Sequence, residues 1–429
     1  MIARGLYLAA TALAAPLIDR YLDKRLARGK EDAERFGERR GRPGRLRPEG
    51  PLVWIHAASN GEAMSSLPLV QRILDRDPKG HVLVTTGTVT SAKLMAARLP
   101  ARAIHQYVPV DRTAWVRSFL KHWRPDTGIW VESEFWPALI WEMRRAGKPM
   151  ALVNGRVSLK SLARWRRIPG IAVDLLDGFD PCLAQTPKDA AHLRDLGAAK
   201  ADCVGNLKLS VPPQPVDGAV LETERARLRG RPVWVAASTH PGEEAIVAEA
   251  HRDLAVAKPD ILTILVPRHP HRGEEIAGML RDKGLTVALR SRGDALTPTV
   301  SVYVADTLGE LGLFYRLAPV AMIGGSLCGG HGGHNPIEPA QLGCIPLCGP
   351  DMTNFATVAA DLLDRGGMAQ VADAADLARA VRRLLEDSKR RSTMAKAAGQ
   401  VTAEGAATAD RVMARLAPIL PPVTPGAGR

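Results

Sequence analysis

A carboxylate near the end of the first predicted strand is the residue best placed for proton transfer. Glu62 follows the apolar stretch Val53–Ala57 and a turn containing Gly61, and it lies at the start of a predicted helix. A carboxylate there could accept a proton from a substrate hydroxyl. The helix N-terminus would lower its pKa and partial burial would raise it, so the sequence leaves its protonation open. The alternative is a carboxylate that only stabilises the helix start.

Two further carboxylates, Glu132 and Glu134, follow the predicted strand Thr127–Val131. In an extended segment, side chains two residues apart lie on one face. With Trp130 and Trp136 beside them, these carboxylates could hold a sugar or stabilise a cationic transition state. A solvated loop is the alternative interpretation.

Cationic residues that could bind phosphate follow other strands. Lys208 lies next to a proline-rich segment, and Leu265–Arg272 is a strand end that carries Arg268 and His269. Arginine fits phosphate in a bidentate manner. His269 and His271 could instead bind a metal, but they have no companion carboxylates and we expect no metal site.

A basic run from Arg156 to Arg167 contains no acidic residue. It fits an acceptor that carries phosphates. Nucleic-acid binding is an alternative, although no recognised nucleic-acid-binding module accompanies the run.

The segment Ile323–Ala340 is rich in glycine, and it follows the predicted buried strand Ala318–Ile323. A helix is predicted to begin at Pro336. Strand, glycine loop and helix N-terminus together form an arrangement suited to holding a phosphate. Glu338, one turn into that helix, could accept hydrogen bonds from ribose hydroxyls. A glycine-rich turn without a ligand is the alternative.

Short apolar runs alternate with amphipathic helical segments on both sides of this chain's proline-rich linker. This alternation predicts an α/β protein with two doubly wound, mainly parallel sheets, whose ligands bind at the carboxyl ends of the strands. The three prolines of the linker cannot lie inside a helix or a central strand. The predicted divisions are an N-terminal segment 1–48, a first domain 49–208, a linker 209–218, a second domain 219–420 and a disordered tail 421–429.

Composition favours an anionic partner. The 429 residues carry a formal net charge of +13, with 46% hydrophobic and 24% charged residues, which is typical of a folded protein. The five cysteines form no CxxC pair and are expected to be reduced thiols. The apolar run Leu6–Ile18, followed by many basic residues, predicts a helix that associates with an anionic membrane surface. A core helix of the first domain is the alternative.

Seven motifs together resemble those of the 3-deoxy-D-manno-octulosonic acid (Kdo) transferases, from about Arg35 to the last helix. In order they are WIHAASNGE, VESEFWP, GNLK, ASTHPGEE, VPRHPHR, DTLGELG and GGHNPIEPA. The resemblance implies a GT-B fold, with two Rossmann-like domains facing each other across a cleft. It implies inverting transfer of Kdo from CMP-Kdo to the lipid A precursor lipid IVA in lipopolysaccharide biosynthesis. CMP-Kdo is then a donor substrate, and no cofactor or metal is required.

The resemblance also implies a place for the protein and a role for each matching residue. The expected location is the cytoplasmic side of the inner membrane, with no nucleic-acid or protein partner. Glu62 matches the general base, and Glu132 and Lys208 match positions that stabilise the transition state. The expected CMP/Kdo-binding residues are Arg268, His269, Leu308, Gly309, Glu310, Gly333, His334, Asn335, Pro336, Ile337 and Glu338. The expected acceptor-binding residues are Ser59, Gly61, Glu134 and Arg156. Cys328–His331 is richer in glycine than the family pattern, and this departure bears on the shape of the loop more than on the activity.

Two other functions remain open at this point. Another GT-B enzyme, such as a UDP-sugar transferase or a non-hydrolysing epimerase, would be recognised by the nucleotide that raises its melting temperature. A non-enzymatic basic protein could bind a membrane surface or nucleic acid, although intact Glu62 and Lys208 speak against this.

Overall fold

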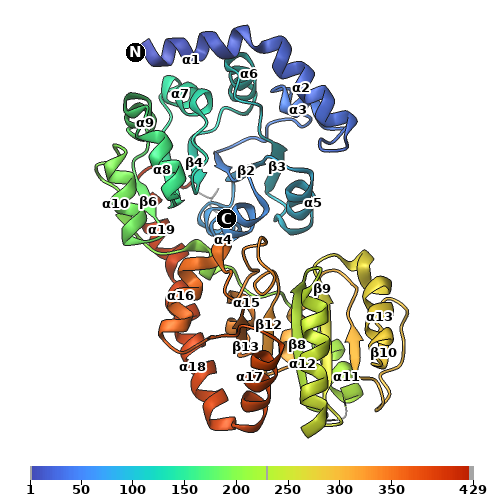
Figure 1. Cartoon of the computed structure of the whole chain (residues 1–429). Helices are drawn as coiled ribbons and strands as arrows, with labels where there is room; N and C mark the ends of the chain where they lie inside the picture. The colour runs from blue at the N-terminus through green and yellow to red at the C-terminus, as the bar shows by residue number, and fades with distance from the viewer. Residues whose placement is uncertain (1, 229, 425–429) are drawn as a thin grey trace, which may run out of the picture. The chain divides into compact units, whose positions relative to one another are not determined.

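The computed structural model describes residues 2–228 and 230–424, and it divides into two compact units (Figure 1). The first unit comprises the chain up to Val211 together with the residues from Gly405 onward, and the second is Pro212–Glu404. Each unit has its own sheet and core.

The first unit is built on a parallel sheet. Within the described residues the sheet has seven strands, in the order β3-β2-β1-β4-β5-β6-β7. The strands are β1 (Leu52–His56), β2 (His81–Thr86), β3 (Ala103–Tyr107), β4 (Thr127–Val131), β5 (Met150–Gly155), β6 (Cys182–Ala184) and β7 (Asp202–Cys203). The central strand β1 is buried along its whole length, because helices cover both faces of the sheet.

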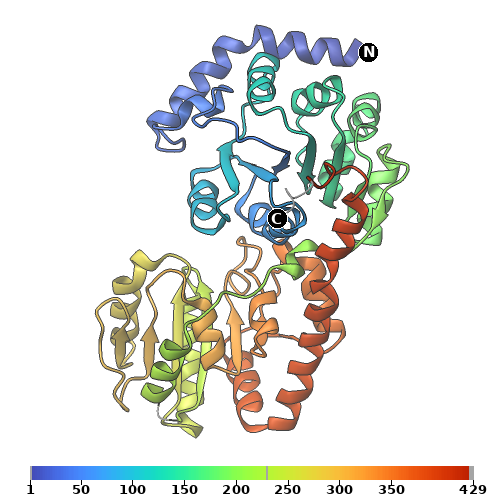
Figure 2. The same cartoon turned by 180° about the vertical axis from the view of Figure 1, so that it is seen from behind.

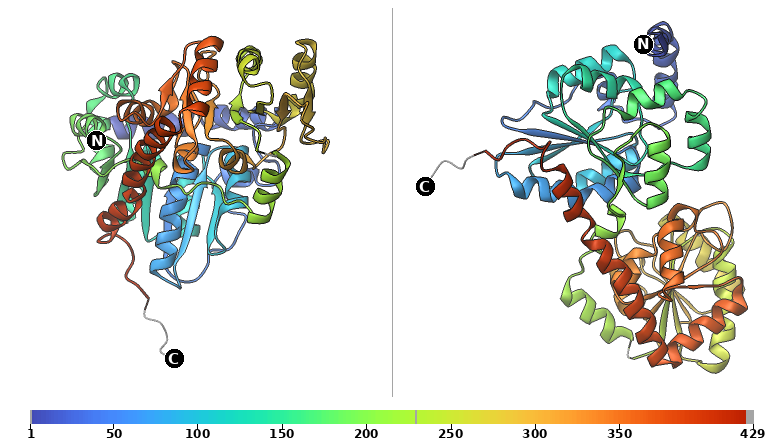
Figure 3. Two further views of the ribbon diagram at one scale, coloured as in Figure 1. Left: turned by 90° about the horizontal axis from the view of Figure 1, so that it is seen from below. Right: turned by 90° about the vertical axis from the view of Figure 1, so that its left-hand side faces the viewer.

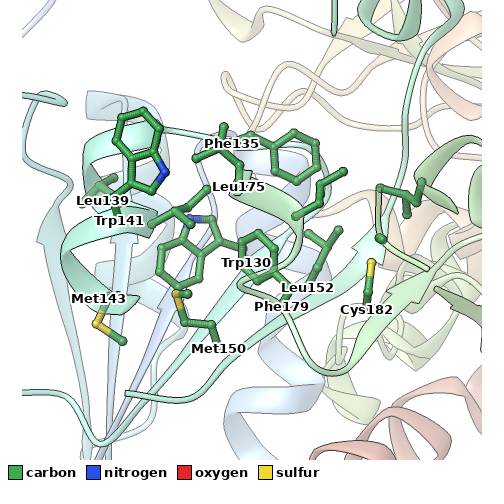
Figure 4. Close-up of a cluster of buried hydrophobic side chains, with 14 of the residues drawn as sticks. Trp130, Phe135, Leu139, Trp141, Met143, Met150, Leu152, Leu175, Phe179 and Cys182 are labelled. Carbon is green, nitrogen blue, oxygen red and sulfur yellow. The ribbon is translucent and has the colours of Figure 1, made fainter. Parts of the chain in front are cut away.

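Alternate residues of β1 pack in the two hydrophobic cores on opposite faces of the sheet. Trp54 packs with Trp130 of β4, with ring centroids 4.9 Å apart, in a cluster rich in aromatic residues that Figure 4 shows around Trp130. Val53 and Ile55 face the opposite core, which is mainly aliphatic. This alternation follows from the two-residue period of a strand.

Helices of the first unit cover these two faces. Leu69 of α4, Met95 of α5 and Val412 of α19 pack in the aliphatic core, whereas α6, α7, α9 and α10 contribute to the aromatic one. The helices are α1 (Ile2–Leu13), α2 (Ala15–Ala27), α3 (Phe36–Arg39), α4 (Asn60–Arg76), α5 (Val89–Arg98), α6 (Thr113–Trp123), α7 (Pro137–Arg145), α8 (Leu159–Trp165), α9 (Pro169–Leu176), α10 (Pro187–Asp195), the 3₁₀ turn η1 (Leu207–Ser210) and α19 (Thr408–Leu416).

The N-terminal apolar run forms α1 and the start of α2, and one side of α1 packs on the aromatic core. Tyr7 donates a hydrogen bond of 2.7 Å to Asp111 and lies edge-on to Trp141. Leu6, Leu13 and Leu17 remain 66%, 84% and 72% exposed. In the described part of the chain, no helix combines the length and the hydropathy that crossing a membrane would need.

The second unit repeats the architecture with a different set of residues (Figure 2). Its described residues form a seven-stranded sheet in the order β10-β11-β9-β8-β12-β13-β14, in which neighbouring strands are parallel. The strands are β8 (Val233–Thr239), β9 (Leu262–Pro267), β10 (Val287–Leu289), β11 (Val302–Val304), β12 (Val320–Ile323), β13 (Ile345–Cys348) and β14 (Ala369–Gln370).

The helices of the second unit are long where they cover the sheet and short near the glycine loop. They are α11 (Gly218–Leu228), α12 (Glu243–Ala257), η2 (Pro270–Arg272), α13 (Gly273–Asp282), α14 (Leu311–Leu317), α15 (Ile337–Gln341), η3 (Thr353–Phe355), α16 (Ala356–Asp364), α17 (Ala374–Glu386) and α18 (Ser388–Ala406). The fold class is thus confirmed as two doubly wound α/β units.

The division of the chain differs from the predicted boundaries at the C-terminus, as the right-hand view of Figure 3 shows for the path of α18 and α19. The predicted second domain continued to residue 420, but α19 belongs to the first unit. Val412 and Leu416 are fully buried in the aliphatic core, and Asp410 forms an ion pair of 2.6 Å with Arg72 of α4. An apolar helix face is stable wherever it is covered, and here the covering elements are α4 and η1.

Candidate active site

Glu62 is positioned by the turn between β1 and α4. Ser59 is the N-cap residue of α4, and its hydroxyl accepts a hydrogen bond from the Glu62 N–H at 3.3 Å. The Glu62 carboxylate in turn accepts hydrogen bonds from the Ala58 N–H and the Ser59 hydroxyl, both at 2.8 Å. This reciprocal capping orders the helix start and fixes the carboxylate at the carboxyl end of β1.

Burial dominates the electrostatics of Glu62. Its residue is only 8% exposed, and this burial, with smaller contributions from the negative charges of Glu134 and Glu132, raises its pKa to about 7. The two hydrogen bonds to the carboxylate oppose the shift but do not cancel it. Burial and the neighbouring carboxylates thus outweigh the hydrogen bonds that Glu62 receives at the helix start. A carboxyl group with a pKa near neutrality can both accept and release a proton.

Glu132 extends from β4 in a strained backbone conformation. Its φ angle is +62°, in the left-handed region that residues other than glycine rarely adopt. The carboxylate forms an ion pair of 2.9 Å with the Lys208 ammonium, and both side chains are largely buried. Asn154, also at positive φ, donates a 3.5 Å hydrogen bond to Glu132 and accepts one from the Leu207 N–H. Such strain, at a carboxylate held by an ion pair, is typical of functional sites.

The first unit therefore brings together the three predicted catalytic residues, Glu62, Glu132 and Lys208. Glu134 joins them: burial and the charge of Glu132 raise its pKa, while a hydrogen bond from the Trp136 indole N–H lowers it. Of the other predicted acceptor-binding residues, Ser59 and Gly61 lie in the capping turn of α4 and are exposed, and Arg156 follows β5.

In the second unit, a different carboxylate organises the glycine loop. Glu243, at the start of α12, is fully buried and accepts hydrogen bonds from the N–H groups of Gly325, Ser326 and Leu327. The N–H groups of Gly330 and Gly332 donate to Asp351. The loop is therefore shaped by two carboxylates of the chain itself. These five amides do not form the phosphate cradle that the glycine pattern predicted, because their hydrogen bonds are already made within the unit.

Imidazole groups, rather than glycine amides, form the most distinctive cluster near this loop. The Nε2 atoms of His240 and His334 are 2.8 Å apart, and the His331 ring stacks on His240 with centroids 3.8 Å apart. Burial, the principal cause, and neighbouring cations lower the pKa of His240 and lower that of His334 to about 4. Arg268 and His269, both exposed at the end of β9, are among the groups that contribute to these shifts.

Gly325 makes this cluster possible. Its φ is +70°, and a Cβ atom added there would lie 3.2 Å from His331 and 3.2 Å from His334. The sequence motifs assign no individual role to His240 or His331. The repeated His-Gly pattern in His331–His334 was a possible signal, but only the fold brings it to His240.

Two predicted nucleotide-binding carboxylates have partners within the second unit. Glu310, the N-cap residue of α14, makes an ion pair with Arg290 and accepts a hydrogen bond from the Thr307 hydroxyl. Glu338 accepts a 3.0 Å hydrogen bond from the Gln214 N–H, so one of its oxygens ties the linker to α15. Of the remaining predicted residues, Leu308 and Gly309 are exposed and Asn335 accepts a hydrogen bond from the Ile337 N–H. Gly333 and Pro336 are buried beside Asn335.

No group of three or more histidine, cysteine, aspartate or glutamate residues within the described ranges could hold a metal ion. The five cysteines are free thiols, and Cys182, Cys344 and Cys348 are buried.

Comparisons with known proteins define first the fold and then the family. A UDP-GlcNAc 2-epimerase from Neisseria meningitidis, solved with UDP-GlcNAc, superposes over 86% of this chain and 100% of its own with a TM-score of 0.60. The identity is 13%, so this likeness shows the fold alone, which is the GT-B type.

Residues 34–211 match the family model described as 3-deoxy-D-manno-octulosonic-acid transferase. The chain is 36% identical to the 3-deoxy-D-manno-octulosonic acid transferase of Bordetella pertussis, over 96% of this chain and 98% of that protein. It is 37% identical to the probable mitochondrial enzyme of Arabidopsis thaliana, over 82% and 80% of the two chains. This chain belongs to the Kdo transferase family of glycosyltransferases and is an enzyme of lipopolysaccharide biosynthesis.

Proposed function

We propose that this enzyme transfers Kdo from CMP-Kdo to lipid IVA with inversion at the anomeric carbon, and that Glu62 is the general base. The observation that carries the proposal is the Glu62 carboxyl group, which is buried beside Glu132 and Glu134 with a pKa raised to about 7. At neutral pH a substantial fraction is ionised, and the conjugate acid is not so weak that proton transfer is unproductive.

The proposed step is a direct displacement. The acceptor hydroxyl oxygen bonds to the anomeric carbon of Kdo while its proton passes to Glu62. The bond from that carbon to the phosphate oxygen breaks, and its electron pair leaves with CMP. The anomeric carbon becomes electron-poor during this exchange, and the carboxylate of Glu132, fixed by Lys208, would stabilise it.

The leaving phosphate needs cationic partners. Arg268 and His269 are exposed at the carboxyl end of β9, where ligands bind in doubly wound sheets. With His334 they are the residues of the second unit that we propose to bind the phosphate of CMP-Kdo. The remaining predicted nucleotide contacts, including Leu308, Gly309 and Asn335, are proposed to line the nucleoside.

We propose association with the cytoplasmic side of the inner membrane through α1 and α2. Leu6, Leu13 and Leu17 are exposed apolar side chains on these helices, and basic residues such as Arg20 and Lys24 follow on α2. An exposed apolar surface flanked by cations is suited to an anionic lipid surface. No cofactor and no metal are proposed to take part.

The testing experiment uses purified enzyme, CMP-Kdo and lipid IVA, with mass spectrometry of the products. Addition of one or more Kdo residues supports the proposal, and the number added defines the product. Glu62→Gln should retain CMP binding, measured by calorimetry, while losing about 10²–10⁴-fold in turnover. Undiminished turnover of this variant would exclude Glu62 as the base. A UDP-sugar rather than CMP-Kdo as the consumed donor would instead favour another GT-B activity.

A further inference from the structure

The His240–His334 contact requires that the two imidazoles share a hydrogen. Their Nε2 atoms are 2.8 Å apart, so one nitrogen must carry the hydrogen and the other must accept it. Because both rings have lowered pKa values, the pair is neutral at neutral pH in the ligand-free protein. The two Nδ1 atoms do not take part in this contact.

A neutral imidazole pair can take up one proton without losing its hydrogen bond. If the ring that donates through Nε2 is protonated at Nδ1, it becomes an imidazolium that still donates to its partner, and the bond becomes charge-assisted. A second proton would remove the accepting lone pair and place two like charges in contact. The two rings therefore titrate as a unit with room for a single proton.

The surroundings of the pair show what would stabilise that proton. Arg268, His269 and His331 face the two rings and disfavour a further positive charge, whereas the buried Glu243 carboxylate favours it at His240. Glu243 already accepts four backbone hydrogen bonds, from His240 and three loop residues. An additional anion beside Arg268 would offset the repulsion and raise the affinity of the pair for a proton.

We propose that His240 and His334 form a proton-holding pair that takes up one proton when the phosphate of the cytidylate binds, and that this proton is the counter-charge for the leaving group. The inference rests on the proposed function, in which that phosphate binds beside Arg268 and His269. A phosphodiester carries one negative charge and becomes a monoester with two charges when the sugar leaves, so a cation placed there is needed more after bond breaking than before it. An interaction that strengthens in this way lowers the barrier.

His331 positions the pair in this proposal. Its ring lies 3.8 Å from His240 at an interplanar angle of 16°, while the rings of His240 and His334 are 7° from parallel. The stack holds the His240 ring in the plane that allows its Nε2 to meet His334. The glycine-rich segment before it lets the loop carry His331 to this place, with Gly330 and Gly332 tied to Asp351.

The test is calorimetry of CMP binding in buffers of different ionisation enthalpy at about pH 8, where the free CMP phosphate is mainly a dianion because its second pKa is about 6. We expect net proton uptake on CMP binding by the wild-type enzyme, and it should increase as the pH is lowered from 8 toward 7, because the pair starts from lowered pKa values. His334→Gln and His240→Gln should each abolish most of this uptake. They should weaken CMP binding without abolishing it, because Arg268 and His269 remain at the end of β9. His271→Gln is the matched control, because His271 is exposed and its ring lies beside that of His269, outside the His240–His334 contact.

The outcomes separate this inference from the proposed function. CMP binding with no proton uptake, or with uptake unchanged in both glutamine variants, would overturn the proton-holding pair and leave the nucleotide site intact. No binding of CMP by the wild-type protein would refute the nucleotide site itself. Thermal unfolding is measured for each variant, because His240 is buried and a substitution there costs stability. His334→Gln, at a less buried position, provides the second readout.

Discussion

Removing the charge of Lys208 should reveal how much the Glu132–Lys208 ion pair contributes to catalysis. In Lys208→Met the Glu132 carboxylate loses its 2.9 Å partner in a largely buried setting. The three carboxylates Glu62, Glu132 and Glu134 would then share a region with one compensating cation fewer. The expected result is a further rise in the pKa of Glu62, since the negative charge of Glu132 is then less compensated.

The magnitude follows from the cost of breaking a buried pair. Removal of one partner of a buried ion pair typically destabilises the folded protein by about 3–5 kcal/mol when the remaining charge stays buried. The Lys208 and Glu132 side chains are 17% and 13% exposed, so solvent screening reduces this cost. We expect the free energy of unfolding of Lys208→Met to be lower by about 1–3 kcal/mol. The same pair holds the strained Glu132 conformation, and turnover should fall about 10²-fold or more as the carboxylate loses its orientation.

The assay combines chemical unfolding with the pH dependence of kcat/KM. The acid limb of the wild-type profile should lie near pH 7, the value to which the pKa of Glu62 is raised, and it should move to higher pH in Lys208→Met. Lys200→Met is the matched control, because Lys200 is exposed and pairs with Asp180 at the surface. A Lys208→Met enzyme with wild-type turnover and an unmoved acid limb would refute the role of this ion pair.

Three further predictions follow from the described contacts. Glu62→Gln should stabilise the protein at high pH relative to wild type. The folded pKa of Glu62 is raised to about 7, so ionisation of Glu62 costs stability above its unfolded pKa near 4.5, and this loss reaches its full size above about pH 7. Unfolding curves at pH 5 and pH 8.5 should show a difference between the two proteins that grows with pH, and a constant difference would contradict this. Gly325→Ala should weaken CMP binding and destabilise the second unit by about 1–3 kcal/mol, because the added Cβ meets His331 and His334 at positive φ. Gly343→Ala is the control: this glycine is also at positive φ, but an added Cβ has nothing within 4 Å, so the variant should cost only the backbone strain. Equal effects of the two variants in calorimetry and unfolding would contradict the steric argument. Replacing Leu13 and Leu17 with Ser should lower binding to anionic lipid vesicles in a flotation assay. The melting temperature should not change, since both side chains are exposed. Unaltered vesicle binding would exclude these two leucines as membrane contacts.

The sequence by itself determined the two alternating halves and most strand positions. The predicted strand Thr127–Val131 coincides with β4, and the predicted strands Val53–Ala57 and Ala318–Ile323 overlap β1 and β12. These elements were accessible because a buried parallel strand needs a continuous apolar run and a covering helix needs one apolar face. Short or weakly patterned elements such as α11, whose polar and apolar residues have no clear period, were not predicted.

The motif order also determined the family, because seven spaced motifs specify it far more sharply than any one of them. The comparisons with the Bordetella and Arabidopsis proteins confirm that assignment. The roles of the individual site residues stay predictions that the experiments above address.

Only the tertiary structure decided the electrostatics of the site and the use of the glycine loop. The pKa of Glu62 depends on burial and on Glu134 and Glu132, which are distant in sequence. Likewise, Glu243 occupies the loop amides and His240 meets His334 across 94 residues, so these contacts exist only once the sheet of the second unit has formed. A residue's type and spacing define the chemistry available to it, whereas its desolvation and its partners are properties of the folded chain.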